Sequence, residues 1–102
     1  MALILEIRDR RGTTTWHPLN GQAVTIGRGL SNDIILDDPY VDARHASIAH
    51  DDAGALTIRD LGSVNGVLIE GVRAHAPIPV QAGVELKIGR TMVRFRDRDE
   101  PV

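Results

Sequence analysis

Apolar and polar residues alternate with a period of two in several short segments of the chain. In an extended strand this spacing sends successive side chains to opposite faces, so that one face can be buried. The clearest alternation covers residues 3–8, 24–26, 56–59, 84–88 and 92–95. No segment carries a sustained helical repeat. The pattern therefore predicts a protein built from short strands.

Turn-forming residues separate these segments at close intervals. They gather at residues 9–12, 20–21, 27–32, 37–39, 51–54, 62–66, 71 and 81–83. Many short strands, with no helix to cover a parallel sheet, favour an all-β fold: an antiparallel β-sandwich or barrel. A chain of 102 residues that is 42% apolar fits one globular domain and leaves no room for a second core. We expect the domain to span residues 1–96, and the charged residues 97–102 to form a tail or the start of a linker.

The composition narrows the class of protein. A net charge of −2 and only three aromatic residues give no broad cationic surface and little stacking area, so we do not expect nucleic-acid binding. The chain has no cysteine, which excludes disulfides and thiolate zinc sites and suits a cytoplasmic location. The opening MALILEI is interrupted by Glu6, and we interpret it as a first strand rather than a signal peptide or a membrane span.

The histidines and serines do not have the spacing of a metal site or a catalytic site. His45 and His50 differ by an odd number of positions on one expected strand, so their side chains point to opposite faces, and the other two histidines lie in different segments. A trio of Ser47 or Ser63 with His45 and Asp42 is the kind that every chain contains, and no serine stands in a G-x-S-x-G turn. We therefore expect no metal, no cofactor and no catalysis.

The function of a sandwich of short strands is expected in its loops, because the interior is used for packing. Three loops carry polar residues that the strand pattern does not explain: GRGLSND at 27–33, DPYVDARHA at 38–46 and DLGSVNG at 60–66. The first could cradle a phosphate, or it could be a turn whose backbone is satisfied by Asn32 and Asp33. It lacks the third glycine and the helix of a dinucleotide site. The third loop, taken alone, could be only a compact turn.

The order of these segments resembles the forkhead-associated (FHA) domain family. The matching segments are GR at 27–28, SNDIIL at 31–36, RHA at 44–46 and DLGSVNG at 60–66, and the resemblance runs from the first strand to Phe95. It implies a β-sandwich of about eleven strands whose loops at one end hold a phosphothreonine peptide. It also implies a protein-interaction module rather than an enzyme. Arginine suits such a site, because a guanidinium makes charge-assisted hydrogen bonds of fixed geometry with phosphate.

Five residues match positions of the family pattern. By this resemblance, Gly27 ends a strand, Arg28 steadies the phosphate and the peptide backbone, and His45 supports the loops from inside. Asn65 corresponds to the asparagine that hydrogen-bonds the peptide main chain, and Gly66 to the glycine that lets the loop turn. The resemblance therefore implies that the frame of a peptide-binding site is present.

Three positions that face the ligand in the family depart from its pattern. Asp42 stands where the family usually has a serine that donates to the phosphate, Ala43 where it often has arginine or another polar residue, and Val64 where it commonly has threonine. A carboxylate about 4 Å from one negative charge costs about 4 kcal/mol at an effective dielectric of about 20, and a phosphothreonine carries nearly two charges. A hydrogen bond to a charged group contributes only about 1.5 to 3 kcal/mol. We therefore expect repulsion from Asp42 to outweigh the attraction that Arg28 alone supplies.

Two hypotheses follow for Asp42 and two for the function. Asp42 accepts hydrogen bonds from Arg28 or Arg44 where a phosphate would otherwise lie, or it caps a solvated turn and touches neither arginine. In the first functional hypothesis the domain binds a protein or peptide, either independently of phosphothreonine or with weak affinity for a phosphopeptide. It does so through the loops at one end of the sandwich or through a sheet face, and it does not insert into a membrane. The rival hypothesis is ordinary phosphothreonine recognition through Arg28, Ser31, Arg44 and Asn65. The expected binding residues are Arg28, Ser31, Asn32, Asp42, Arg44, Val64 and Asn65, supported by Gly27, His45 and Gly66.

Overall fold

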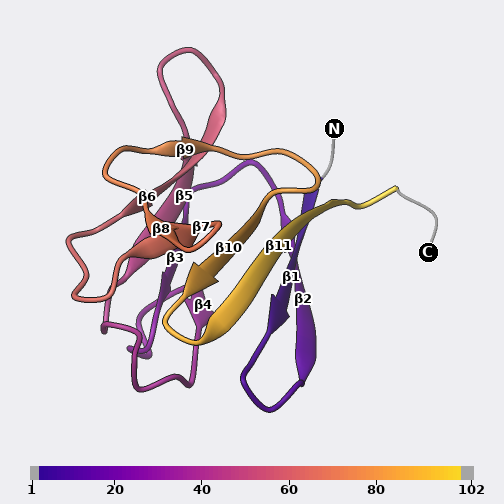
Figure 1. The fold of residues 1–102 in the computed structure, drawn as a ribbon. Coiled ribbons are helices and arrows are strands. Elements are labelled where there is room, and N and C mark those ends of the chain that lie inside the picture. Colours follow the sequence, from indigo (N-terminus) through magenta and orange to yellow (C-terminus); the bar gives the residue numbers. More distant parts are fainter. Residues whose placement is uncertain (1–2, 100–102) are drawn as a thin grey trace.

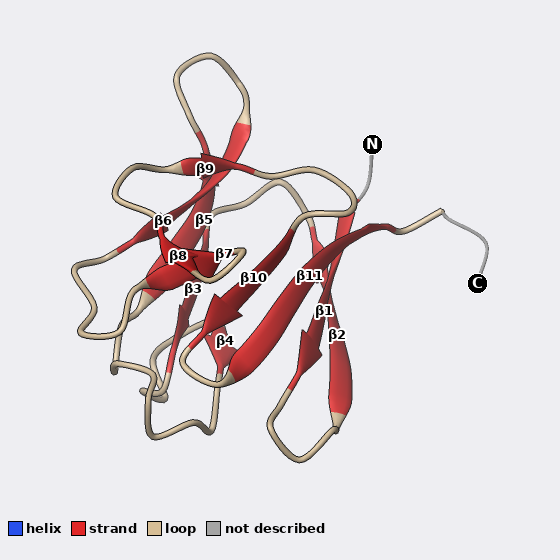
Figure 2. Cartoon of the chain, viewed as in Figure 1, coloured by secondary structure: helices blue, strands red, loops and turns tan. Residues whose placement is uncertain are grey.

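The computed structural model describes residues 3–99 and consists of two β-sheets packed face to face (Figure 1 and Figure 2). Within these residues there are eleven strands and no helix, so the predicted all-β sandwich is confirmed. Accordingly, the described part of the chain contains no helix long and apolar enough to cross a membrane. Residues 1–2 of the expected domain and 100–102 of the expected tail lie outside the described residues.

The larger sheet has six strands and the smaller one has five. In spatial order the larger sheet contains β2 (Thr14–Leu19), β1 (Leu3–Arg8), β11 (Thr91–Asp97), β10 (Glu85–Ile88), β7 (Val67–Ile69) and β8 (Val72–Arg73). The smaller sheet contains β4 (Ile34–Ile35), β3 (Val24–Gly27), β5 (Ala46–His50), β6 (Leu56–Asp60) and β9 (Ile78–Pro79). The first and last strands of the chain, β1 and β11, are neighbours, so strand pairing within the larger sheet joins residues that are far apart in sequence.

The hydrophobic core lies between the two sheets. Leu5 on β1 and Phe95 on β11 are opposite each other in the register, and both are fully buried. Ile26, Ile48 and Ile58 contribute from three adjacent strands of the smaller sheet. Most residues that the period-two pattern assigns to an inner face are buried, and burying an aliphatic or aromatic side chain of this size contributes about 1.5 to 3 kcal/mol.

One strand pairing departs from the antiparallel expectation. Strands β3 and β4 run parallel, with Ile26 opposite Ile34 and Gly27 opposite Ile35. Parallel neighbours usually need a long crossover connection. This pair covers only two positions, so residues 28–33 suffice to bring the chain back to the level of Ile26, and no helix is needed.

Three connections meet at one end of the sandwich, which we call the loop end. They are the β3–β4 loop (28–33), the β4–β5 loop (36–45) and the β6–β7 loop (61–66), and hydrogen bonds join the first to the second and the second to the third. Figure 1 shows the loop end on the other side of the molecule from the start of β1 and the end of β11. The fold therefore gathers the polar segments singled out in the sequence.

Candidate functional site

The β3–β4 and β4–β5 loops are held together by main-chain and side-chain hydrogen bonds. Arg28 N donates to Asp42 O at 2.9 Å and Gly29 N donates to Ala43 O at 3.1 Å. The Asn32 amide adds two bonds, from Nδ2 to Gly29 O at 2.7 Å and to Ala43 O at 2.6 Å. Asn32 is only 7% exposed, so it lies beneath the surface of the loop end, where it joins the β3–β4 loop to the β4–β5 loop.

The close approach of these loops explains why residue 27 is glycine. A Cβ atom at Gly27 would collide with the carbonyl oxygen of Ala43 and would lie 2.8 Å from Nδ2 of Asn32. Both obstacles belong to the hydrogen-bonded frame rather than to a flexible side chain. A side chain at this position would therefore push the β4–β5 loop away from the end of β3.

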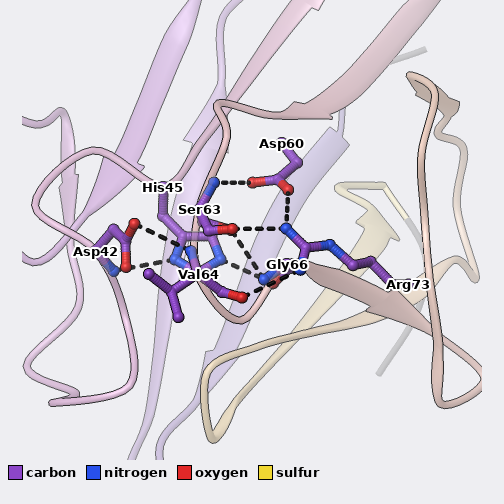
Figure 3. Close-up of polar contacts among 7 residues, drawn as sticks. All are labelled: Asp42, His45, Asp60, Ser63, Val64, Gly66 and Arg73. Atoms are coloured by element: carbon purple, nitrogen blue, oxygen red, sulfur yellow. Dashed lines mark hydrogen bonds and ion pairs between the residues drawn. The ribbon is translucent and has the colours of Figure 1, made fainter.

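His45 is fully buried and connects loops from the inside. Its Nδ1 accepts a hydrogen bond from Asp42 N at 3.1 Å, and its Nε2 lies 2.8 Å from Gly66 O (Figure 3). Because an N–H donates to Nδ1, the proton of the neutral ring is on Nε2, which donates to the Gly66 carbonyl. The main-chain N–H of His45 also donates to Ile26 O at 2.9 Å. One ring thus links the β4–β5 loop to the β6–β7 loop, and neither of its nitrogens is bonded to a serine.

In the described part of the chain the Asp42 carboxylate pairs with no arginine, so the hypothesis of a carboxylate held by Arg28 or Arg44 is wrong. Within residues 3–99, the hydrogen bond that the Asp42 carboxylate accepts comes from the main-chain N–H of Val64, 3.2 Å from Oδ2 (Figure 3). The alternative is right in that the carboxylate of Asp42 touches neither arginine, although its main-chain oxygen accepts from Arg28 N. Its partner lies in the β6–β7 loop, and no sequence pattern predicts this contact.

Arg28 lies along the β4–β5 loop. Its Nε donates to Val41 O at 3.0 Å, and the side chain is exposed. In the described part of the chain, the two terminal nitrogens of Arg28 have no hydrogen-bond partner, and the exposed side chains of Ser31 and Arg44 have none either. These groups are open to an incoming ligand.

The β6–β7 loop presents Val64 and Asn65 at the surface. Val64 is 77% exposed, and Asn65 Nδ2 donates to Tyr40 O at 2.9 Å, which links this loop to the β4–β5 loop. Inside the loop, Ser63 Oγ accepts a hydrogen bond from Gly66 N at 2.9 Å, and Gly66 has a φ of 77°. Glycine adopts this left-handed conformation without the penalty that a Cβ imposes.

Sequence reasoning missed Asp60 and Arg73, which hold the β6–β7 loop from behind. Asp60 accepts a hydrogen bond from Ser63 N at 3.0 Å and pairs with Arg73 Nη2 at 3.2 Å. Burial acts to raise the pKa of Asp60, but hydrogen bonds from Ser63 and Arg73 outweigh it and hold the pKa below its ordinary value. No motif would have found Arg73, because it lies on a two-residue strand and most of its partners are main-chain oxygens.

Asp38 is a buried carboxylate that sequence reasoning also missed. It is only 3% exposed and accepts hydrogen bonds from Tyr40 N at 2.8 Å, Arg90 N at 2.7 Å and Thr91 Oγ1 at 2.9 Å. Burial acts to raise the pKa of Asp38, but these bonds, with a contribution from Arg10, outweigh it and lower the pKa. Asp38 therefore ties the β4–β5 loop to the turn between β10 and β11.

The charged and polar groups do not assemble into a metal centre. Across residues 3–99, no group of three or more histidine, aspartate or glutamate side chains is placed to hold a metal ion. His45 is buried before β5 and His50 is exposed at its end. The loop end presents arginine, amide and apolar groups on a hydrogen-bonded frame.

Comparisons with known proteins agree on one family. The family model of the FHA domain matches residues 24–89. The FHA domain-containing protein FhaB of Mycolicibacterium smegmatis is 31% identical over 78 residues, which cover 76% of this chain and 50% of FhaB. This chain therefore spans about half the length of that relative.

Two solved structures show the same fold. The Slr1951 protein of Synechocystis sp. has a TM-score of 0.83 and 29% identity, covering 94% of this chain and 98% of its own. Mycobacterium tuberculosis EmbR, solved in complex with a low affinity phosphopeptide, has a TM-score of 0.74 and 31% identity, covering 91% of this chain and 24% of its own. The similarity to EmbR is thus confined to about a quarter of that protein.

Proposed function

Because this chain belongs to the FHA domain family, whose members are protein-interaction modules, we propose that its loop end is a non-catalytic binding site for a protein or peptide, and that its affinity for phosphothreonine is weak or absent. The structure of the similar protein EmbR holds a low affinity phosphopeptide. The proposal places the partner against Arg28, Arg44, Val64 and Asn65, which reach the surface of the loop end.

The observation that carries the proposal is the contact between the Asp42 carboxylate and the Val64 N–H. By the family pattern, residue 42 is where a serine hydroxyl would face the phosphate. A carboxylate at that position offers only acceptors, and it also occupies a main-chain donor that an anion could use. A phosphate must therefore displace Asp42 from the Val64 N–H, or bind beside the carboxylate and be repelled by its negative charge.

The balance of energies supports weak phosphate binding. At about 4 Å, one carboxylate and one phosphate charge repel by about 4 kcal/mol at an effective dielectric of about 20, and solvent at the exposed loop end reduces this figure. Arg28 offers an attraction of about 1.5 to 3 kcal/mol for each hydrogen bond to a charged group. Its Nε is already bonded to Val41 O, which leaves only its terminal nitrogens for a phosphate.

Ordinary phosphothreonine recognition is the second candidate. The terminal nitrogens of Arg28 point to no protein acceptor within the described residues, and Arg44 and Ser31 are exposed nearby in sequence. Two arginines that turn toward a dianion could offset one carboxylate. This candidate requires Asp42 to leave Val64, or to stay clear of the phosphate.

Titration with paired peptide libraries separates the two candidates. A degenerate library centred on phosphothreonine and the same library with threonine are titrated against the wild-type chain, Asp42→Ser, and the double variant Asp42→Ser with Ala43→Arg. We expect weak or absent phosphate-dependent binding by the wild type and a gain of at least about tenfold for the double variant, because repulsion is removed and a donor is added. Asp37→Ser is the matched control: it removes one exposed carboxylate from the same loop, and within the described residues no hydrogen bond joins Asp37 to Val64.

The outcomes are distinct. Micromolar binding by the wild type that depends on the phosphate would establish ordinary recognition and overturn the weakened site. Equal gains for Asp42→Ser and Asp37→Ser would show that only net charge matters. If both libraries bind and the NMR chemical shifts of the loop-end residues do not change during the titration, the partner site lies on a sheet face instead.

The proposal extends to the cellular setting. A net charge of −2 argues against a nucleic-acid partner, and the absence of cysteine suits the cytoplasm. We therefore propose a cytoplasmic protein or peptide partner, to be checked by locating the tagged full chain in fractionated cells.

A further inference from the structure

The guanidinium of Arg73 reaches from β8 into the back of the β6–β7 loop. Nη2 donates to Ser63 O at 2.6 Å and lies 3.2 Å from Oδ2 of Asp60, while Nη1 donates to Val64 O at 3.1 Å (Figure 3). Three oxygens, two of them from the loop main chain, thus surround one planar group. A main-chain carbonyl that would otherwise rely on water is held by a charged donor.

The stem of Arg73 also packs against this loop. A Cβ atom built on Gly66 would lie 2.7 Å from Arg73 Nε and 2.9 Å from both Cδ and Cγ. The missing side chain of Gly66 therefore makes room for the arginine, in addition to allowing the φ of 77°. Both the stem and the head of Arg73 fit the present conformation of the loop.

These contacts fix the peptide units on both sides of Val64. Its N–H donates to Asp42 and its C=O accepts from Arg73. The side chain, 77% exposed, and the adjacent Asn65 are thereby presented in one orientation at the surface of the loop end. A loop ordered before binding loses less conformational entropy when a partner arrives.

We infer that Arg73 is a positioning residue for partner binding: it fixes the conformation of the β6–β7 loop and touches no partner itself. The inference rests on the proposed function, in which this loop contacts the partner. An arginine is required because its planar fork can serve three acceptors at once, whereas lysine offers a single nitrogen on a flexible stem.

The chain offers a matched control in Arg59. Arg59 and Arg73 line the same groove behind the loop, and within the described residues the Arg59 side chain has no hydrogen-bond or ion-pair partner. The variants Arg73→Gln and Arg59→Gln therefore remove the same charge from the same neighbourhood. Arg73→Lys is the conservative variant, which keeps the charge but not the fork.

The first measurement is amide hydrogen exchange of the full chain, followed residue by residue with NMR. We expect Arg73→Gln to speed exchange in residues 61–66 by at least about tenfold while exchange in β5 stays as in the wild type, because only the loop is released. Arg73→Lys should fall between the two, and Arg59→Gln should match the wild type. Unchanged exchange in 61–66 for Arg73→Gln would overturn the inference, as would an equal increase throughout the chain.

The second measurement is affinity for the phosphothreonine library, with Arg73→Gln and Arg59→Gln each introduced into the double variant Asp42→Ser with Ala43→Arg, whose binding is expected to be strong enough to measure. The temperature is one at which all variants are folded. We expect Arg73→Gln to weaken binding by about tenfold, mainly through faster dissociation, and Arg59→Gln to leave it unchanged. Equal losses for both variants would reduce Arg73 to a general charge effect and overturn its positioning role.

The two proposals fail in different ways. If the wild-type chain binds neither library at the loop end, the proposed function fails, and the exchange measurement still decides whether Arg73 orders the loop. If binding is present but Arg73→Gln keeps both the wild-type affinity and the wild-type exchange, only the inference about Arg73 fails.

Discussion

At the residue scale, His45 shows how a polar group can be stable in an apolar interior. The ring is fully buried, and each of its nitrogens is bonded to a main-chain group of a different loop. Its removal would leave the Asp42 N–H and the Gly66 C=O without partners in a space that a smaller side chain cannot fill. Unsatisfied buried groups cost more than the net contribution of the bonds themselves.

We therefore predict that His45→Ala lowers the free energy of unfolding by about 3 kcal/mol, because two main-chain groups lose their partner and a cavity is left. Chemical denaturation of the full chain measures this change. His50→Ala is the control, since His50 is exposed at the end of β5 and should change the stability by less than about 0.5 kcal/mol. Equal midpoints for the two variants would remove the structural role proposed for His45.

The residue scale also marks the limit of prediction from the sequence. Gly27, His45 and Gly66 could be singled out because a motif fixes their identity and order. The donor to Asp42 could not, because Val64 lies 22 positions away and any main-chain N–H of the facing loop has the same chemistry. The role of Arg73 could not be predicted for the same reason: no pattern of side chains indicates a hydrogen bond to a main-chain carbonyl oxygen.

At the scale of elements, Asp38 couples two connections that belong to different sheets. The β4–β5 loop leaves the smaller sheet and the β10–β11 turn lies in the larger one, and a single buried carboxylate bonds to groups of both. Arg90 in that turn also lies over the ring of Tyr40, 4.3 Å from its centre. The loop end is therefore braced against the larger sheet at the β10–β11 turn.

This brace predicts how stability depends on pH. The pKa of Asp38 is lowered in the folded protein, so its contribution is complete above the unfolded value of about 3.9 and is lost as the pH falls through the lower folded value. Asp60, whose pKa is also lowered, acts in the same direction. The free energy of unfolding should therefore decline as the pH falls from about 5 to about 2.

Asp38→Asn tests this origin of the decline. The variant should lose about 2 kcal/mol at pH 7, because an amide nitrogen would replace one acceptor oxygen, and its stability should fall less steeply in acid. Urea unfolding at a series of pH values gives both numbers. Asp37→Asn, an exposed neighbour, controls for the loss of charge. An acid slope in Asp38→Asn as steep as in the wild type would contradict the assignment.

The strands themselves divide into those that a pattern reveals and those that it does not. Strands such as β1 and β11 are long enough for alternation to be visible, and they were predicted. Strands β8 and β9 have two residues each, too few to show a period, and their pairing depends on where neighbouring strands already lie. The parallel course of β4 is likewise a result of assembly.

At the scale of the whole molecule, the fold depends on strands outside the segment that the family model matches. Residues 24–89 exclude the whole of β1, β2 and β11. Those strands supply Leu5 and Phe95, which are fully buried in the core. The loop end lies within the matched segment, but half of the larger sheet does not.

A chain cut to residues 24–89 is therefore expected not to fold, although it contains the entire loop end. The smaller sheet would lose the apolar surface against which it packs, and a small domain has little stability to spare. Far-ultraviolet circular dichroism and the dispersion of a 1H–15N spectrum, compared with those of the full chain, test this. A dispersed spectrum from the fragment would show that the outer strands are dispensable.

The pairing of β1 with β11 has a mechanical consequence. Leu3 is opposite Asp97, so tension applied to the chain at these two points acts across the strands and breaks the hydrogen bonds between them one pair after another. A load along the strands would instead have to break all the hydrogen bonds between them together. A polypeptide pulled from both sides in an optical trap should therefore open this domain at low force, beginning with β1 and β11, and the binding loops would lose their support only after these strands had parted.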